Sequence, residues 1–229
     1  MLTSSNGQAV LQATAGTAVS IDPARVFFVG QSLGSIEGTL DLAANPRFSR
    51  AVLNVGGATI VDILTSPESA VGDSFLASLA AAGILPGTQD FLLILIGTKW
   101  ILDPAEPANF AQHLVTSPLP NLLDPSGGLQ APKSILGQGA RCDGVVPNTQ
   151  NELLYGLIGL APLNPTTASS TPGLQWFMTS SAAGACPTGA TAHGFLLDWN
   201  NPSMATAAQT NVVSYLLGGP VSPSPVVVP

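Results

Sequence analysis

Short, continuous apolar runs alternate with helical repeats along this chain. Val26–Val29 is an unbroken apolar run, and the residues after it place Ile36, Leu40 and a pair of alanines at helical spacing before Pro46. An unbroken apolar run indicates a buried strand, and a repeat of three to four residues indicates a helix that a proline then ends. We therefore predict a strand, a sharp turn and a helix over residues 26–44.

Three further apolar runs predict three more strands. They cover residues 48–55, which end at two consecutive glycines, residues 133–138 and residues 174–179. Strands that alternate with helices imply a parallel sheet. The chain is therefore predicted to be an α/β protein, with a parallel sheet flanked by helices.

Two later helices follow from their start and stop signals. Thr149 and Glu152 have the spacing of a capping box, in which each side chain bonds a backbone N–H at the start of the helix. Residues 202–217 have proline in the first turn and Gly218 at the end, as helices often do. We expect one helix to begin at Thr149 and the last helix to end before Gly218.

The long segment between the second and third strands is expected to be an insertion. Residues 58–130 hold Leu-, Ala- and Ile-rich helical patterns broken by prolines, and they are too many for a single crossover. We predict one domain over residues 1–219 with a helical cap insertion at about 58–130. The Pro/Val-rich tail, 220–229, is expected to be extended and mobile.

Composition narrows the possible partners. Of the 229 residues 45% are hydrophobic and 8% are charged, with six Lys or Arg against thirteen Asp or Glu, for a net charge of −7. The few basic residues are scattered, which argues against a nucleic-acid partner. The longest apolar run, Phe91–Ile96, is far shorter than the roughly 18 residues that a membrane span needs. A protein that handles apolar material fits this composition, as does an ordinary low-lysine secreted protein.

A candidate nucleophile stands where the first predicted strand ends. Gly30, Gln31, Ser32, Leu33 and Gly34 form a G-x-S-x-G sequence between a predicted strand and a predicted helix. Glycines at these positions permit a strained turn that lifts the serine hydroxyl clear of the sheet. The alternative is a buried turn serine bonded to the backbone.

A serine nucleophile needs a histidine base, and the chain has two histidines. His113 lies in the cap insertion, where a place on a helix face is the simpler interpretation. His193 lies in a Gly- and Ala-rich stretch after the fourth predicted strand, from which a loop can fold back over Ser32. We therefore assign the base to His193.

The base in turn needs a carboxylate to orient it. Asp143 follows the third predicted strand through small residues, which would leave its side chain at the same edge of the sheet. Asp103 and Asp124 lie beside prolines in the insertion, where turn or capping roles fit better. The alternative for Asp143 itself is an Asx turn.

These residues carry a resemblance to a known superfamily. The strand, the GQSLG turn and the helix, then Asp143 in RCDGVVPN and His193 in AHGF, resemble the α/β-hydrolase superfamily in its chain order of Ser, Asp and His. Within it, residues 21–57 and 102–114 are similar to the C-terminal half of bacterial extracellular lipases and esterases. The resemblance implies Ser32 as nucleophile, His193 as base and then acid, and Asp143 as the group that orients it.

The resemblance also implies an oxyanion hole, and it implies strands before the nucleophile strand that this sequence does not show. The backbone N–H of Leu33 would be one oxyanion donor. Members of the superfamily have several strands before the nucleophile strand, and a loop after one of them provides the second donor, whereas about 24 residues precede Arg25 here. The first strand would then be an apolar edge. We expect self-association or a complementing N-terminal half to cover it.

The two cysteines leave two possibilities. Cys142 adjoins Asp143, and Cys186 lies seven residues before His193. A disulfide between them would tie the acid loop to the histidine loop and would favour an oxidising location. The alternative is two buried thiols that do not meet.

The predicted function is that of a serine carboxylester hydrolase, a lipase or esterase that acts through an acyl-enzyme without a cofactor or metal ion. A polyester depolymerase or acyltransferase could use the same triad, and a catalytically silent fragment that assembles with a missing half is a further alternative. The N-terminus lacks the basic start and apolar core of a signal peptide. The protein is therefore either intracellular or secreted with a targeting segment that this sequence does not include, and we expect it to be secreted.

Overall fold

Four parallel strands form the sheet of this protein. The computed structural model describes residue 22 and residues 25–177, 192–200 and 202–223. The strands are β1 (Phe28–Gln31), β2 (Arg50–Asn54), β3 (Ser134–Ala140) and β4 (Gly173–Phe177), and they lie in the order β1-β2-β3-β4. Every neighbouring pair is parallel. The predicted α/β class with a parallel sheet is confirmed.

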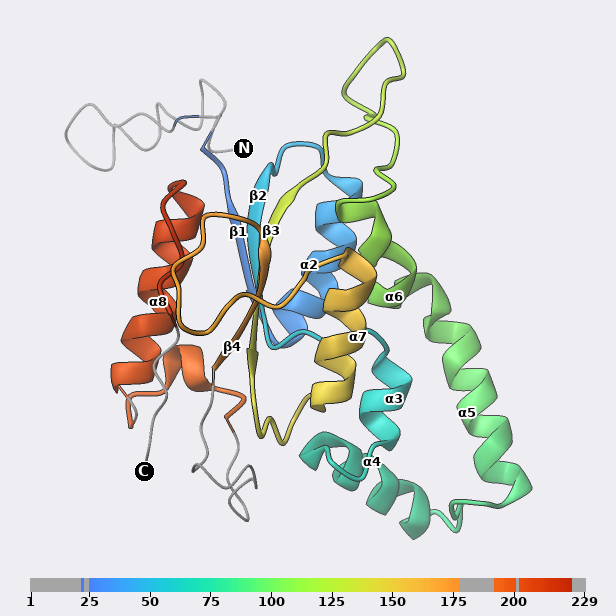
Figure 1. Ribbon diagram of the computed structural model, residues 1–229. Coiled ribbons are helices and arrows are strands. Elements are labelled where there is room, and N and C mark those ends of the chain that lie inside the picture. The colour runs from blue at the N-terminus through green and yellow to red at the C-terminus, as the bar shows by residue number, and fades with distance from the viewer. Residues whose placement is uncertain (1–21, 23–24, 178–191, 201, 224–229) are drawn as a thin grey trace, which may run out of the picture.

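Helices cover both faces of the sheet. Helices α2 (Leu33–Ala44) and α7 (Asn148–Ile158) lie on one face, and α8 (Pro202–Leu216) lies on the other (Figure 1). Leu42, Leu154 and Tyr155 anchor one buried cluster against the strands, and a second cluster joins α8 to the opposite face. The sheet is thus buried between two apolar layers, as a parallel sheet requires.

The segment between β2 and β3 is largely helical. It holds α3 (Ile60–Thr65), α4 (Ala70–Ala81), α5 (Gln89–Leu102), α6 (Pro107–Phe110) and two short 3-10 helices, η1 (Asp103–Ala105) and η2 (Ala111–Leu114). A third 3-10 helix, η3, covers Phe195–Leu197. Helices α4 and α5 extend away from the sheet (Figure 1). Among the described helices, none combines the length and apolarity that crossing a bilayer would need.

Helix α2 has the predicted bounds, whereas the predicted capping box is wrong. Helix α7 begins at Asn148 with Pro147 as its N-cap, so Thr149 already lies inside the first turn and no side chain caps the helix. Glu152 instead accepts a hydrogen bond from Arg141 at 2.8 Å. Pro147 precedes the first turn of this helix, and Glu152 is bonded to Arg141 and not to the backbone at the helix start.

The described part of the C-terminal tail is packed, in contrast to the mobile end expected from its composition. Val221 is buried in the cluster around α8. The backbone carbonyl of Ser222 accepts hydrogen bonds from the side-chain amides of Gln175 and Asn211, at 2.8 and 3.0 Å. Residues 224–229 lie outside the described residues.

Strand β1 and helix α2 approach each other closely at one glycine. A Cβ atom on Gly30 would lie 2.4 Å from the carbonyl oxygen of Gly34, closer than any real contact. A Cβ atom on Gly34 would meet nothing within 4 Å. Of the two glycines in the predicted turn, only Gly30 is required by the packing.

This difference predicts opposite outcomes for two alanine substitutions. Gly30→Ala should lower the free energy of unfolding by about 2–3 kcal/mol, because backbone must move to admit the methyl group. Gly34→Ala should leave it unchanged or raise it by about 0.5 kcal/mol, because alanine favours the helix. Urea unfolding of the two variants and the parent measures both. Equal effects would contradict the close approach at Gly30.

Two tyrosines are buried with their hydroxyl groups bonded. Tyr155 is fully buried, its hydroxyl lies 2.9 Å from the carbonyl oxygen of Leu53, and it accepts a hydrogen bond from the N–H of Gly56. Burial raises the pKa of Tyr155 and, less strongly, that of Tyr215. Both groups thus keep their protons in the folded chain at a pH where the unfolded chain loses them.

The raised pKa values predict a loss of stability in alkali. The tyrosine contribution is fully present below pH of about 10 and is lost above it, by up to about 1.4 kcal/mol per pH unit for each tyrosine. Tyr155→Phe should be about 1–2 kcal/mol less stable at neutral pH, because its hydrogen bonds are lost. Its stability should then fall less steeply than the parent's above pH of about 10, as urea unfolding at several pH values measures. Parallel curves for both proteins would contradict the buried, protonated state of Tyr155.

Candidate active site

Ser32 occupies a strained turn between β1 and α2. Its backbone angles, φ 55° and ψ −121°, lie in the left-handed half of conformational space. Its N–H donates to the carbonyl of Asn54 on the neighbouring strand at 2.9 Å. The buried hydroxyl of Ser35 lies 2.7 Å from the carbonyl oxygen of Gly30 and 2.8 Å from that of Asn54. These bonds fix the turn from both sides.

Strained backbone gathers at the carboxyl edge of the sheet. The non-glycine residues with positive φ in the described part of the chain are Ser32, Val55 and Cys142, and they follow the ends of β1, β2 and β3 respectively. Such conformations cost of order 1–3 kcal/mol each and tend to occur at functional sites. In open α/β sheets, binding and active sites commonly lie at the carboxyl ends of the strands. The strained residues of this protein lie at that same edge.

Asp143 lies on the loop between β3 and α7, with its side chain fully buried. Its Oδ1 atom accepts hydrogen bonds from the N–H groups of Val145 at 2.9 Å and of Val146 at 3.0 Å. The first of these bonds is that of an Asx turn, the alternative considered for Asp143. The turn holds the carboxylate in one orientation.

His193 lies between the other two side chains. Its Nδ1 atom is 2.9 Å from Oδ2 of Asp143, and its Nε2 atom is 2.7 Å from Oγ of Ser32. A proton on Nδ1 that is donated to Asp143 leaves Nε2 free to accept the serine proton. The structure thus brings together the three residues that the sequence singled out, from positions that lie between 50 and 161 residues apart.

The remaining residues of the predicted turn lie around this chain of hydrogen bonds. The backbone N–H of Leu33 is the first of α2, where a helix has no acceptor of its own. The side-chain amide of Gln31 donates to the backbone carbonyl of His193 at 3.4 Å. Sequence reasoning listed Gln31 only as part of the turn, and it did not identify Ser35 or the two valine N–H groups. A serine directly after G-x-S-x-G was the one available signal for Ser35.

The residues set aside in the sequence lie elsewhere. His113 is half-buried on η2, and its Nδ1 atom is 2.6 Å from the carbonyl oxygen of Ser117. Asp124 binds the backbone and side chain of Ser126 in a turn, and these hydrogen bonds lower its pKa. Neither residue takes part in the hydrogen-bonded chain at Ser32.

Cys142 is buried beside Asp143. Cys186, its predicted partner, lies outside the described residues, so the disulfide between the two stays a prediction. Among the described residues, no cluster of three or more His, Cys, Asp or Glu side chains is placed to hold a metal ion.

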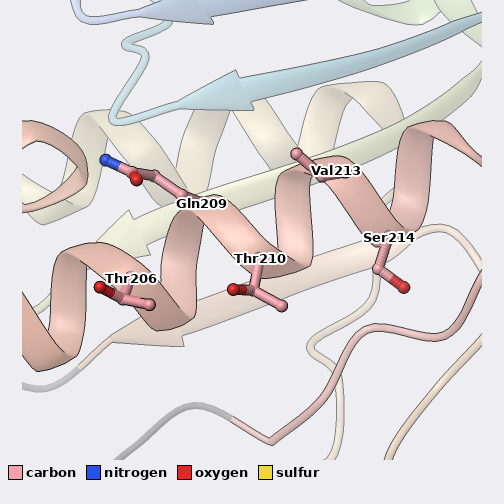
Figure 2. A pocket seen from close by; sticks show the side chains of 5 residues that line it. All are labelled: Thr206, Gln209, Thr210, Val213 and Ser214. Carbon is pink, nitrogen blue, oxygen red and sulfur yellow. The ribbon is translucent and has the colours of Figure 1, made fainter.

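A shallow groove of about 410 Å³ follows the outer side of α8, lined by Thr206, Gln209, Thr210, Val213 and Ser214. All five side chains come from this one helix (Figure 2). The groove includes none of the three hydrogen-bonded residues, so it is a surface feature separate from the candidate site.

Comparisons with known proteins give similarity to solved structures alone. No protein-family model matches the chain, and no curated protein matches it. A puromycin hydrolase is 14% identical with a TM-score of 0.47, over 96% of this chain and 26% of that one. Acylaminoacyl peptidase from Pyrococcus horikoshii is 13% identical with a TM-score of 0.44, over 84% of this chain and 23% of that one.

An acetyl xylan esterase from a Thermoanaerobacterium species is 12% identical with a TM-score of 0.42, over 80% of this chain and 47% of that one. The chain thus spans from about a quarter to about half of the length of these proteins. Identities and TM-scores this low carry no argument about activity. What this chain does therefore has to be inferred from its own residues.

Proposed function

We propose that this protein is a serine hydrolase that cleaves carboxylic esters through an acyl-enzyme. The observation that carries the proposal is the continuous hydrogen-bonded chain from Ser32 Oγ through His193 to the buried carboxylate of Asp143. The proposed nucleophile, base and orienting group each lie within hydrogen-bonding distance of the next, as covalent catalysis by serine requires.

In the proposed first half-reaction, Ser32 Oγ attacks the ester carbonyl carbon while its proton passes to Nε2 of His193. Asp143 holds the imidazole so that Nε2 faces the serine, and it stabilises the imidazolium that forms. The negative oxygen of the tetrahedral intermediate receives a hydrogen bond from the N–H of Leu33. The intermediate collapses, and the leaving alcohol takes the proton from Nε2.

The second half-reaction releases the acid. A water molecule gives its proton to Nε2 of His193 and attacks the acyl carbon bonded to Ser32. The second tetrahedral intermediate collapses, and Ser32 Oγ regains the proton from the imidazolium. The net change is one ester and one water converted to one carboxylic acid and one alcohol, with the enzyme restored.

The apolar surface of the cap insertion supports an apolar acyl group as substrate. Ile63 and Phe91 of the insertion are buried, while Leu92 and Leu93 are more than half exposed. Ile96, Trp100 and Ile101 extend this exposed surface along α5. Exposed apolar patches commonly mark binding surfaces. We propose that this α5 surface favours esters with longer acyl chains.

The first strand supports the proposal of a further partner. Among the described strands, β1 pairs with β2 on one side and with none on the other. Val29 on this strand is 46% exposed. Unpaired backbone along an apolar edge favours the addition of another strand. We propose that a second copy, or a separate N-terminal half that carries the second oxyanion donor, covers this edge.

Loss of the nucleophile should abolish ester hydrolysis while the fold is retained. Ser32→Ala should lower kcat on p-nitrophenyl esters by about 10⁴-fold or more. Asp143→Asn and His193→Ala should be severe too, and neither should add to Ser32→Ala, because the three residues act as one unit. His113→Ala, the matched histidine control, should stay within about twofold of the parent. Undiminished hydrolysis by Ser32→Ala, or a large loss at His113 with none at His193, would overturn the assignment.

The α5 surface should change the preference for acyl length. Leu92→Ser with Leu93→Ser should lower kcat/KM about tenfold on decanoate esters and hardly change it on acetate, because about 1–2 kcal/mol of apolar contact is lost. The control is Leu122→Ser with Leu123→Ser, two exposed leucines on the loop before β3. A parent enzyme indifferent to acyl length would contradict a role for α5.

A charge on the open edge should prevent assembly. Val29→Lys should shift the sedimentation coefficient from that of a complex to that of a monomer, because lysine on an edge strand opposes strand addition. Val213→Lys, on an exposed position of α8, is the control. A parent chain that sediments as a fully active monomer would contradict the proposed partner.

A further inference from the structure

The loop that carries Asp143 is tied to the start of helix α4. The N–H of Ala70 donates to the carbonyl of Gly144 at 2.8 Å. The hydroxyl of Ser69 donates to the carbonyl of Val145 at 2.7 Å. These two hydrogen bonds join two segments that are more than 70 residues apart in the sequence. The cap insertion is thus anchored on the acid loop.

Ser69 holds this junction with one buried side chain. The residue has no exposed surface. As the N-cap of α4, its hydroxyl oxygen also accepts a hydrogen bond from the N–H of Gly72 at 3.1 Å. The hydroxyl therefore uses its donor and its acceptor capacity at once, so its position is set by α4 on one side and by the acid loop on the other.

The peptide groups around Val145 connect Ser69 to the carboxylate. The carbonyl of Val145 accepts from Ser69, and the N–H of the same residue donates to Oδ1 of Asp143. Val146, whose N–H donates to the same oxygen, packs with Ile63 of α3 in a small buried cluster. A displacement of the Val145 backbone would therefore turn the Asp143 carboxylate away from His193.

We propose that Ser69 is a positioning residue for the triad, which acts through the Val145 backbone on Asp143. This proposal rests on the serine hydrolase function proposed above. It gives the start of helix α4 a part in catalysis, separate from any contact of α5 with the acyl chain. Helix capping alone would make Ser69 matter for stability and leave turnover unchanged.

A second capping residue of the insertion provides a matched control. Thr88 is the N-cap of α5, and its hydroxyl accepts from the N–H of Phe91 at 3.3 Å and donates to the carbonyl of Leu85. Both bonds lie within the insertion and neither reaches the acid loop. Ser69→Ala and Thr88→Ala thus each remove a helix cap, but only Ser69→Ala releases Val145.

The kinetic test compares these variants on p-nitrophenyl acetate, whose short acyl group makes little use of α5. Ser69→Ala should lower kcat about tenfold and leave KM within about twofold, because the carboxylate is misplaced after the substrate has bound. Thr88→Ala should leave both constants within about twofold. Equal effects of the two variants would overturn the proposal.

A double-mutant cycle separates positioning from a general loss of structure. In an Asp143→Asn background the oriented carboxylate is already gone, so Ser69→Ala should change kcat by less than about twofold. The same tenfold loss in both backgrounds would show that Ser69 acts independently of Asp143, and the proposal would be wrong.

A spectroscopic measurement tests Ser69 without any activity. The hydrogen-bonded Nδ1 proton of His193 can be assigned by NMR through His113→Ala and His193→Ala, since the chain has two histidines. In Ser69→Ala this proton should exchange with water about tenfold faster, or its signal should be lost, while Thr88→Ala keeps it. An unchanged signal in Ser69→Ala contradicts the positioning role even if the parent hydrolyses no ester. A parent without ester hydrolysis contradicts the proposed function alone.

Discussion

The left-handed turn at Ser32 is the constraint on which the rest of the candidate site depends. A serine is strained at φ 55°, so the turn persists only because its surroundings fix it. The N–H of Ser32 is bonded to β2 through the carbonyl of Asn54, and the hydroxyl of Ser35 joins that carbonyl to Gly30. Gly30 allows β1 to pass against the start of α2 where a side chain would not fit. The candidate nucleophile is therefore held by the sheet and the helix together.

The parallel sheet also positions the other two residues of the candidate site, Asp143 and His193. The strands end at the same edge, and Asp143, after β3, and His193, which follows β4 in the sequence, lie beside the turn after β1. The carboxylate is then oriented by two backbone N–H groups, and the imidazole by the carboxylate. The segment between β2 and β3 contacts the loop of Asp143 through Ser69 and Ala70, which donate to the carbonyl groups of residues 145 and 144.

The elements with strong local signals could be predicted from the sequence. Helix α2 begins at Leu33 and ends at Ala44 as its spacing and Pro46 indicated, and Asp143 and His193 follow their strands. Strand β1 begins two residues later than predicted and continues to Gln31, because pairing with β2 sets its bounds and apolarity alone does not. An apolar run thus predicts well that a strand is present, but it predicts poorly where the strand begins and ends.

The features that depend on contacts between distant residues could not be predicted. Thr149 and Glu152 have capping-box spacing, yet Pro147 is the N-cap residue of α7, and Glu152 forms an ion pair with Arg141. Ser69 shows no local sign of its contact with Val145, 76 residues later. Leu92 and Leu93 are more than half exposed on α5, which the apolar pattern of this segment alone did not indicate.

The most direct measurement of the central claim is the site of covalent labelling by a fluorophosphonate. This reagent reacts with a serine whose hydroxyl is activated by a neighbouring base, and it stays bonded to that oxygen. Peptide mapping by mass spectrometry should find one phosphonyl group, on Ser32, and none in the His193→Ala variant. A chain that takes no label at Ser32, or that is labelled equally well without His193, would contradict the assignment of Ser32, His193 and Asp143 as a working triad.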